Sequence, residues 1–101
     1  TTQAISAEVH KTNLTIDAIQ SYGPDADADY DGTMWVKLGN NSDWGAITCD
    51  ASWLIVDADA YPHMVAMLIS AYHTDETLRI YVNDSYITDT FCHIKKLRIE
   101  K

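Results

Sequence analysis

Three aspartates at alternate positions form the clearest candidate metal-binding motif in the sequence. Asp27, Asp29 and Asp31 precede Gly32 in the run Asp-Ala-Asp-Tyr-Asp-Gly, which matches the opening of an EF-hand calcium loop. Alternate side chains in a tight turn gather hard oxygen ligands, and the glycine permits the bend. Leu38 occupies the position that needs a bidentate glutamate, so a solvated acidic loop is the simpler interpretation. We predict at most weak calcium binding and no other cofactor.

Cys49 and Cys92 are the only cysteines in the chain. Their separation excludes a CxxC redox motif, and two thiolates alone do not make a zinc site. A disulfide and a pair of buried thiols both remain open. We predict the disulfide, because closing a loop of this length would stabilise a small domain by about 4 kcal/mol. A start at Thr1 rather than Met is expected either of an exported chain whose leader has been removed or of a chain shortened at this end.

The remaining reactive residue types do not suggest catalysis. The four histidines lack the spacing of metal ligands, and His93 has no thiolate neighbour if Cys92 is disulfide-bonded. Asp57 and Asp59 could act as an acid–base pair. Pro62 follows them closely, however, so we assign both carboxylates to the start of a helix. We therefore predict that the protein is not an enzyme.

Large aromatic residues are frequent for a chain of this length. They include Trp35, Trp44, Trp53, Tyr22, Tyr30, Tyr81 and Tyr86. Trp35 and Tyr81 alternate with the apolar residues of two predicted strands, so we expect both side chains to point away from the core. Exposed aromatic rings suit stacking on sugars or a protein interface. We predict Trp35 and Tyr81 as ligand-binding residues, and Trp53 as part of the core.

Composition indicates one folded, acidic domain. The chain has 101 residues, of which 47% are hydrophobic, enough for a single core spanning residues 1–101. The formal net charge is −8, and all of it falls on residues 1–60. This charge argues against nucleic acid and anionic membrane surfaces as partners. No apolar run approaches the roughly 20 residues of a membrane span.

Hydrophobic periodicity predicts a mainly β protein with one helix. Alternation with a period of two predicts strands over residues 4–9, 13–19, 34–38, 46–56, 77–82 and 92–99. The last strand needs a bulge between Ile94 and Leu97. A helix is predicted after Pro62 from the apolar stripe Met64, Met67, Leu68, Ala71 and Tyr72. This order is typical of a five-stranded OB barrel, and a split α+β sandwich is the alternative.

The C-terminal half resembles a known family. Met64 to Val82, followed by Cys92-His-Ile-Lys-Lys-Leu-Arg-Ile, is similar to the OB-fold binding subunits of AB5 toxins of the heat-labile and subtilase types. It is also similar to small secreted bacterial proteins without assigned function. The resemblance covers roughly residues 46–101 and includes no glycan-contacting motif, so no functional residue is carried over. It implies an OB-like fold, export, and ring assembly into a homo-oligomer that recognises carbohydrate.

We therefore expect a secreted or periplasmic, non-catalytic binding module that is oligomeric and favours a glycan as its ligand. The alternative is an acidic periplasmic immunity or inhibitor protein that blocks a basic enzyme cleft. Complementary charge accelerates and orients such an association. The partner is a glycan in the first case and a protein in the second.

Overall fold

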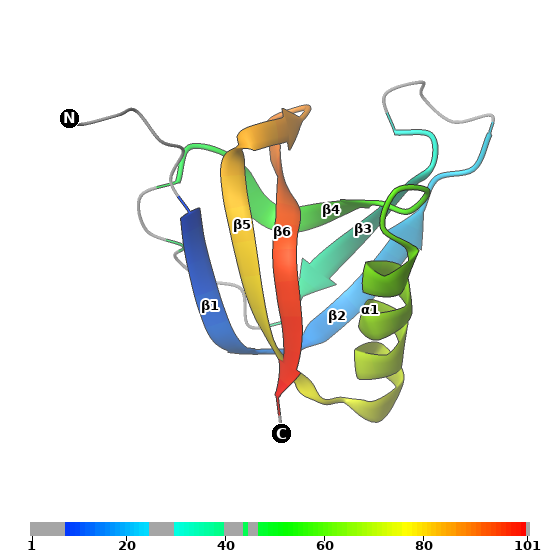
Figure 1. The fold of residues 1–101 in the computed structure, drawn as a ribbon, viewed down its shortest axis with the longest axis vertical. Coiled ribbons are helices and arrows are strands. Elements are labelled where there is room, and N and C mark those ends of the chain that lie inside the picture. Colours follow the sequence, from blue (N-terminus) through cyan, green and yellow to red (C-terminus); the bar gives the residue numbers. More distant parts are fainter. Residues whose placement is uncertain (1–7, 25–29, 40–43, 45–46, 101) are drawn as a thin grey trace.

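The computed structural model describes residues 8–24, 30–39, 44 and 47–100, apart from the side chains of residues 8 and 83–86. Figure 1 shows a mainly β protein with one helix, as predicted. In chain order the elements are β1 (Glu8–Leu14), β2 (Ile16–Ser21), β3 (Thr33–Leu38), β4 (Asp50–Asp57), α1 (Pro62–Thr74), β5 (Thr77–Thr88) and β6 (Phe91–Glu100).

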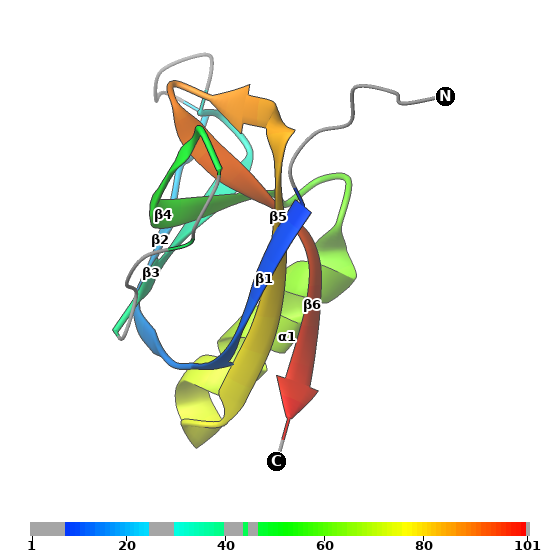
Figure 2. The ribbon, with the colours of Figure 1, turned by 90° about the vertical axis from the view of Figure 1, so that its left-hand side faces the viewer.

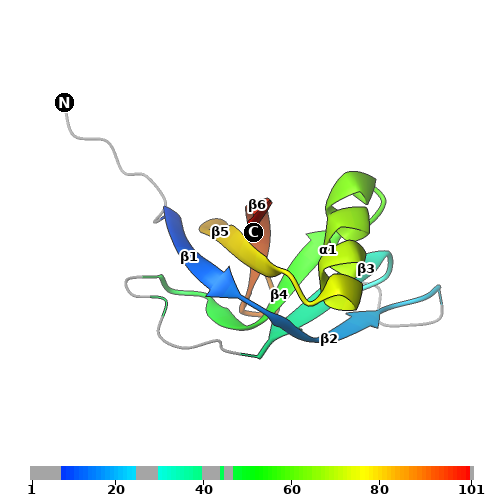
Figure 3. The same ribbon diagram turned by 90° about the horizontal axis from the view of Figure 1, so that it is seen from below.

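The strands form one sheet in the order β1-β5-β6-β4-β3-β2. Neighbours are antiparallel except for β4 and β6, which are parallel. Only Thr15 separates β1 from β2, so one continuous segment supplies both edges of the sheet (Figures 1 and 3). Asn13 has a positive φ of 58°, and the β1–β5 register shifts there. This bend separates β1 from β2. The six strands form an open sheet, and the closed five-stranded barrel predicted from the pattern is not confirmed.

The core lies between the inner side of the curved sheet and α1. The predicted inward residues of β3 and β5 are all at most 4% exposed, namely Met34, Val36, Leu38, Leu78, Ile80 and Val82. Helix α1 contacts β2 and β6. It lies on the opposite side of the molecule from β1 (Figures 1 and 2). Leu68 and Ala71 are buried, but Tyr72 is 47% exposed, so its predicted place in the core is wrong.

No helix in the described ranges is long and apolar enough to cross a membrane.

The helix start differs from the prediction. Tyr61 occupies the N-cap position without a side-chain hydrogen bond, and no acidic residue lies in the first turn. Asp57 Oδ1 instead accepts hydrogen bonds from the backbone N–H groups of Asp59 and Ala60, at 3.2 and 3.3 Å. Asp57 therefore stabilises the turn between β4 and α1, not the helix itself. At the other end, Asp75 adopts the left-handed conformation that ends many helices.

Strands β5 and β6 form a hairpin that is longer than the sequence pattern predicts. The connecting residues Asp89 and Thr90 both have positive φ, 50° and 72°, as a two-residue type I′ turn requires. Further along, Tyr81 pairs with Lys96 and Val82 with Ile94. Lys95 is therefore the extra residue of a bulge, which confirms the bulge predicted for this strand.

Cys49 and Cys92 form the predicted disulfide. Cys49 directly precedes β4, and Cys92 is the second residue of β6. Next to the disulfide, the backbone N–H of Asp50, the first residue of β4, donates to the carbonyl of Thr90, which directly precedes β6, at 2.7 Å. The disulfide thus fixes the beginnings of two parallel neighbours that are far apart in the sequence.

Candidate functional site

An open pocket lies on the outer side of the sheet, away from the core. Its volume is about 280 Å³, and it is lined by one amide and five aromatic side chains: Gln20, Tyr22, Tyr30, Trp35, Trp53 and Phe91. We call this site the aromatic pocket. None of the six lining residues carries a charge at neutral pH, and none is a histidine, cysteine or serine.

Strand register brings the lining residues together. Gln20 of β2 pairs with Trp35 of β3, and Trp35 pairs with Ile55 of β4. Because side chains alternate between the two faces of a sheet, Trp53 lies on the same outer face as Ile55. Phe91 begins β6 directly after the β5–β6 turn. Sequence segments separated by up to about 70 residues thus meet at one site.

Trp35 is at the centre of the pocket but is not exposed. Its side chain points away from the core, as predicted, yet the residue is only 5% exposed. Three rings pack edge-on against the indole, with centroid distances of 5.7 Å to Tyr22, 5.1 Å to Tyr30 and 5.0 Å to Phe91. The prediction of an exposed Trp35 is wrong because other aromatic side chains cover the outer face here. Trp53, predicted as core, is half-buried and lines the pocket.

Hydrogen bonds fix the orientation of these rings. Trp35 Nε1 donates to Thr33 Oγ1 at 2.8 Å, and that hydroxyl donates to the carbonyl of Tyr30 at 2.5 Å. The Tyr30 hydroxyl donates to a carboxylate oxygen of Asp89. The β2–β3 connection is thereby joined to the β5–β6 turn. A site held in this way loses little conformational entropy when a ligand binds.

Polar groups at the edge of the pocket are available for hydrogen bonding. Gln20 is exposed, and its Nε2 donates to the hydroxyl of Tyr22 at 2.7 Å. The Asp89 carboxylate, which accepts the Tyr30 hydroxyl, is also on an exposed residue, as is Asp31. The pocket therefore combines an apolar aromatic floor with a neutral amide, phenol hydroxyls and nearby carboxylates.

His93 is the one buried polar or charged residue in the described chain, at 7% exposure. It lies beside Ile55 in the β4–β6 pairing, and its Nε2 is 2.8 Å from Thr88 Oγ1. Burial lowers the pKa of His93, and the nearby Asp57 carboxylate opposes this change. The imidazole is therefore held mainly in its neutral form.

Tyr81 does not line the aromatic pocket. It is half-buried on β5, where its ring lies 4.8 Å from that of His10, and Lys96 Nζ is 4.3 Å from its centroid. Of the two predicted ligand-binding residues, only Trp35 lines the pocket. Gln20 and Phe91 were not singled out by sequence reasoning, because a lone amide and a lone phenylalanine carry no motif.

The predicted calcium loop lies largely outside the described residues. Asp27 and Asp29 belong to the part that is not described, and Asp31 is exposed. Among the described residues, no group of three or more His, Cys, Asp or Glu side chains could hold a metal ion. Weak calcium binding at residues 27–31 stays a prediction.

Comparison with known proteins gives no match. No family model, no curated protein and no solved structure is similar to this chain at a significant level. Its function must therefore be argued from the geometry of the aromatic pocket.

Proposed function

We propose that this protein is a non-catalytic binding module whose aromatic pocket takes a neutral sugar ring. The observation that carries the proposal is the lining itself: five aromatic side chains surround an uncharged pocket of about 280 Å³. This volume is close to the lower end of small-molecule sites, which span about 300–1,000 Å³. Binding is favoured over catalysis because the lining holds no histidine, cysteine, serine or carboxylate, the commonest nucleophiles and general bases.

An OB-like interpretation of the strand order supports this choice. If β1 and β2 are counted as one bent strand, the chain has five strands, and α1 follows the third of them. The order of these five strands in the sheet is then 1-2-3-5-4-1. Aromatic residues Trp35 and Trp53 then lie on the second and third strands, and Tyr30 lies in the loop between the first two. OB folds bind oligonucleotides and oligosaccharides on that face and with that loop.

Net charge favours a saccharide over an oligonucleotide as the ligand. The chain has a formal net charge of −8, and exposed carboxylates of Asp31 and Asp89 lie on the segments that flank the pocket. A polynucleotide would bring phosphates toward these acids with no lining cation to offset them. A neutral saccharide has no such cost, and its hydroxyls can bond to Gln20 and to the tyrosine hydroxyls.

The disulfide is consistent with a protein that works outside a reducing compartment, since such bonds persist mainly in secreted and periplasmic proteins. We accordingly propose secretion or a periplasmic location. Assembly into a homo-oligomer, as in the AB5 binding subunits that the sequence resembles, would multiply weak sugar contacts into useful avidity.

A glycan array with fluorescently labelled protein tests the proposal. We expect selective binding to a subset of neutral glycans, and at least about tenfold weaker binding by Trp53→Ala, which removes a stacking surface. Tyr72→Ala is the matched control, because Tyr72 is an exposed aromatic residue on α1 outside the pocket. Circular dichroism confirms that both variants fold.

Two results would contradict the proposal. One is the absence of glycan binding by the folded wild-type protein. The other is equal loss of binding in the Trp53 and Tyr72 variants. Capture of a basic enzyme in place of a glycan would instead favour the inhibitor function.

A further inference from the structure

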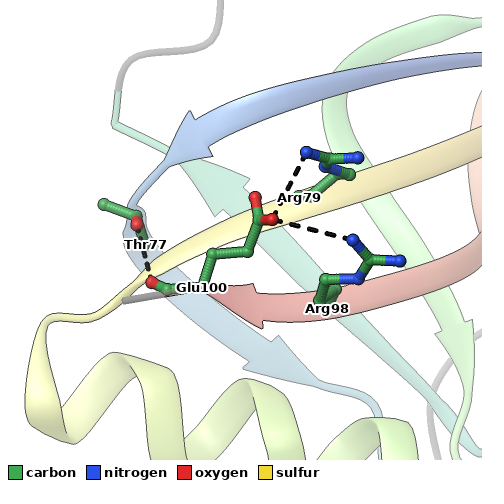
Figure 4. Close-up of polar contacts among 4 residues, drawn as sticks. All are labelled: Thr77, Arg79, Arg98 and Glu100. Carbon is green, nitrogen blue, oxygen red and sulfur yellow. Dashed lines mark hydrogen bonds and ion pairs between the residues drawn. The ribbon is translucent and has the colours of Figure 1, made fainter.

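A second cluster of side chains occupies the outer face of β5 and β6. Lys96 Nζ lies 4.3 Å from the centroid of the Tyr81 ring, and Arg79 and Arg98 lie close to the carboxylate of Glu100. We call the three basic residues the cationic cluster. Figure 4 shows Arg79 and Arg98 on neighbouring strands, with the Glu100 carboxylate between them. This cluster shares no residue with the aromatic pocket.

The two arginines are placed directly opposite each other. Arg79 pairs with Arg98 in the antiparallel β5–β6 register, and like charges at opposed positions repel. Glu100 offsets part of this repulsion, because one of its oxygens lies 3.3 Å from Arg79 and 3.8 Å from Arg98. A single carboxylate oxygen therefore already bridges both guanidinium groups.

Glu100 does not neutralise the cluster. Lys96 adds a third positive charge beside the Tyr81 ring. Glu100 is the only acidic residue among the described side chains of β1, β5 and β6. Three cations against one carboxylate leave an excess of positive charge, in a chain whose formal net charge is −8. Such a local excess of positive charge attracts anions.

One charged donor of the cluster is also left without an acceptor. Arg79 Nε is buried and makes no hydrogen bond, which is unfavourable for a charged donor. The side chain of Arg98 is 57% exposed. An oxyanion that replaces Glu100 between the two guanidinium groups would accept hydrogen bonds from the terminal nitrogens that now face the Glu100 carboxylate. The planar arginine fork matches carboxylate and sulfate oxygens in this geometry.

We propose that the cationic cluster is a second binding site, for the carboxylate or sulfate of a small acidic ligand. Arg79 and Arg98 hold the oxyanion in the position that Glu100 now occupies, and Lys96 supplies additional charge. Glu100 acts as an internal competitor that the ligand displaces. The site stands whether or not the aromatic pocket binds sugar.

Nuclear magnetic resonance titration tests this site. The arginine Nε–H signals are followed while sodium sulfate, glucuronate or glucose is added, with sodium chloride at matched ionic strength as the reference because salt screens exposed charges. Arg79→Lys assigns the Arg79 signal by removing it. We expect sulfate and glucuronate to shift the Arg79 and Arg98 signals saturably, while chloride and glucose do not. Tighter binding of sulfate points to a free oxyanion, and tighter binding of glucuronate points to an oxyanion carried by a sugar.

Variants of Arg98 and Glu100 should change the affinity for the oxyanion in opposite directions, which a merely structural role of these two residues would not produce. Arg98→Gln should weaken sulfate and glucuronate binding at least about tenfold, since it removes a charged hydrogen-bond donor. Glu100→Gln should strengthen binding, because it removes the competitor. Lys37→Gln, at an exposed cation on β3, should change nothing. Shifts no larger than those with chloride, or no gain of affinity in Glu100→Gln, would overturn the proposal.

Discussion

Replacing Trp35 tests whether the aromatic pocket is a packed part of the structure. Trp35 is 5% exposed and contacts three aromatic rings. Truncating a buried tryptophan to alanine typically costs about 3–5 kcal/mol. Since small domains have a stability of only about 5–15 kcal/mol, Trp35→Ala should remove a large part of it. The corresponding decrease in Tm is at least about 12 °C for a domain of this size.

A graded series separates ring packing from hydrogen bonding. Trp35→Phe keeps an aromatic ring but loses the hydrogen bond from Nε1 to Thr33 Oγ1, whose loss costs about 1 kcal/mol, in addition to the smaller ring area. Urea denaturation followed by circular dichroism measures each free energy of unfolding. Tyr72→Ala, at an exposed aromatic residue, should stay within about 0.5 kcal/mol of wild type. A loss below about 1 kcal/mol in Trp35→Ala would refute the packed arrangement.

Three further predictions concern the disulfide, His93 and calcium. Thiol titration of the unfolded, unreduced protein should find no free thiol, and Cys49→Ser with Cys92→Ser should lower stability by about 4 kcal/mol on the chain-entropy model; two titratable thiols would contradict the structure. Because burial lowers the pKa of His93, its imidazole is protonated at a higher pH in the unfolded state than in the folded state. The free energy of unfolding should therefore decrease as the pH falls below about 6.5, by at most about 1.4 kcal/mol per pH unit. His93→Gln should flatten this dependence, and an unchanged slope in His93→Gln would refute it. Melting in millimolar calcium should match melting in chelator, and an increase of several degrees would show that residues 27–31 bind the ion.

The fold could be predicted in large part because its signals are local. The alternation of Met34, Val36 and Leu38 defines a strand and its inner face, and all three residues are buried. Pro62 and the apolar stripe that follows locate α1. The hairpin between β5 and β6 was missed beyond Val82 because its turn residues, Asp89 and Thr90, lack the glycine that usually marks a type I′ turn.

The candidate site could be predicted only in part because its signals are not local. Period-two alternation places Trp35 on the outer face, but it does not show whether other segments cover that face. Tyr22 and Tyr30 cover it from the β2–β3 connection, and Phe91 covers it from β6. Strand order brings these rings together, and strand order is set by long-range pairing. Pairing also places Tyr81 in a separate cluster with His10.

The indole N–H signals of the three tryptophans provide the most direct test of sugar binding at the aromatic pocket. Trp35 and Trp53 line the pocket, whereas Trp44 is 6% exposed and belongs to the core cluster, so it is an internal control. A panel of neutral methyl glycosides is titrated into ¹⁵N-labelled protein. We predict that at least one sugar shifts the Trp35 and Trp53 signals saturably and leaves the Trp44 signal unchanged. If no glycoside in the panel moves the Trp35 and Trp53 signals, or if all three indoles move together, the pocket is not a sugar-binding site.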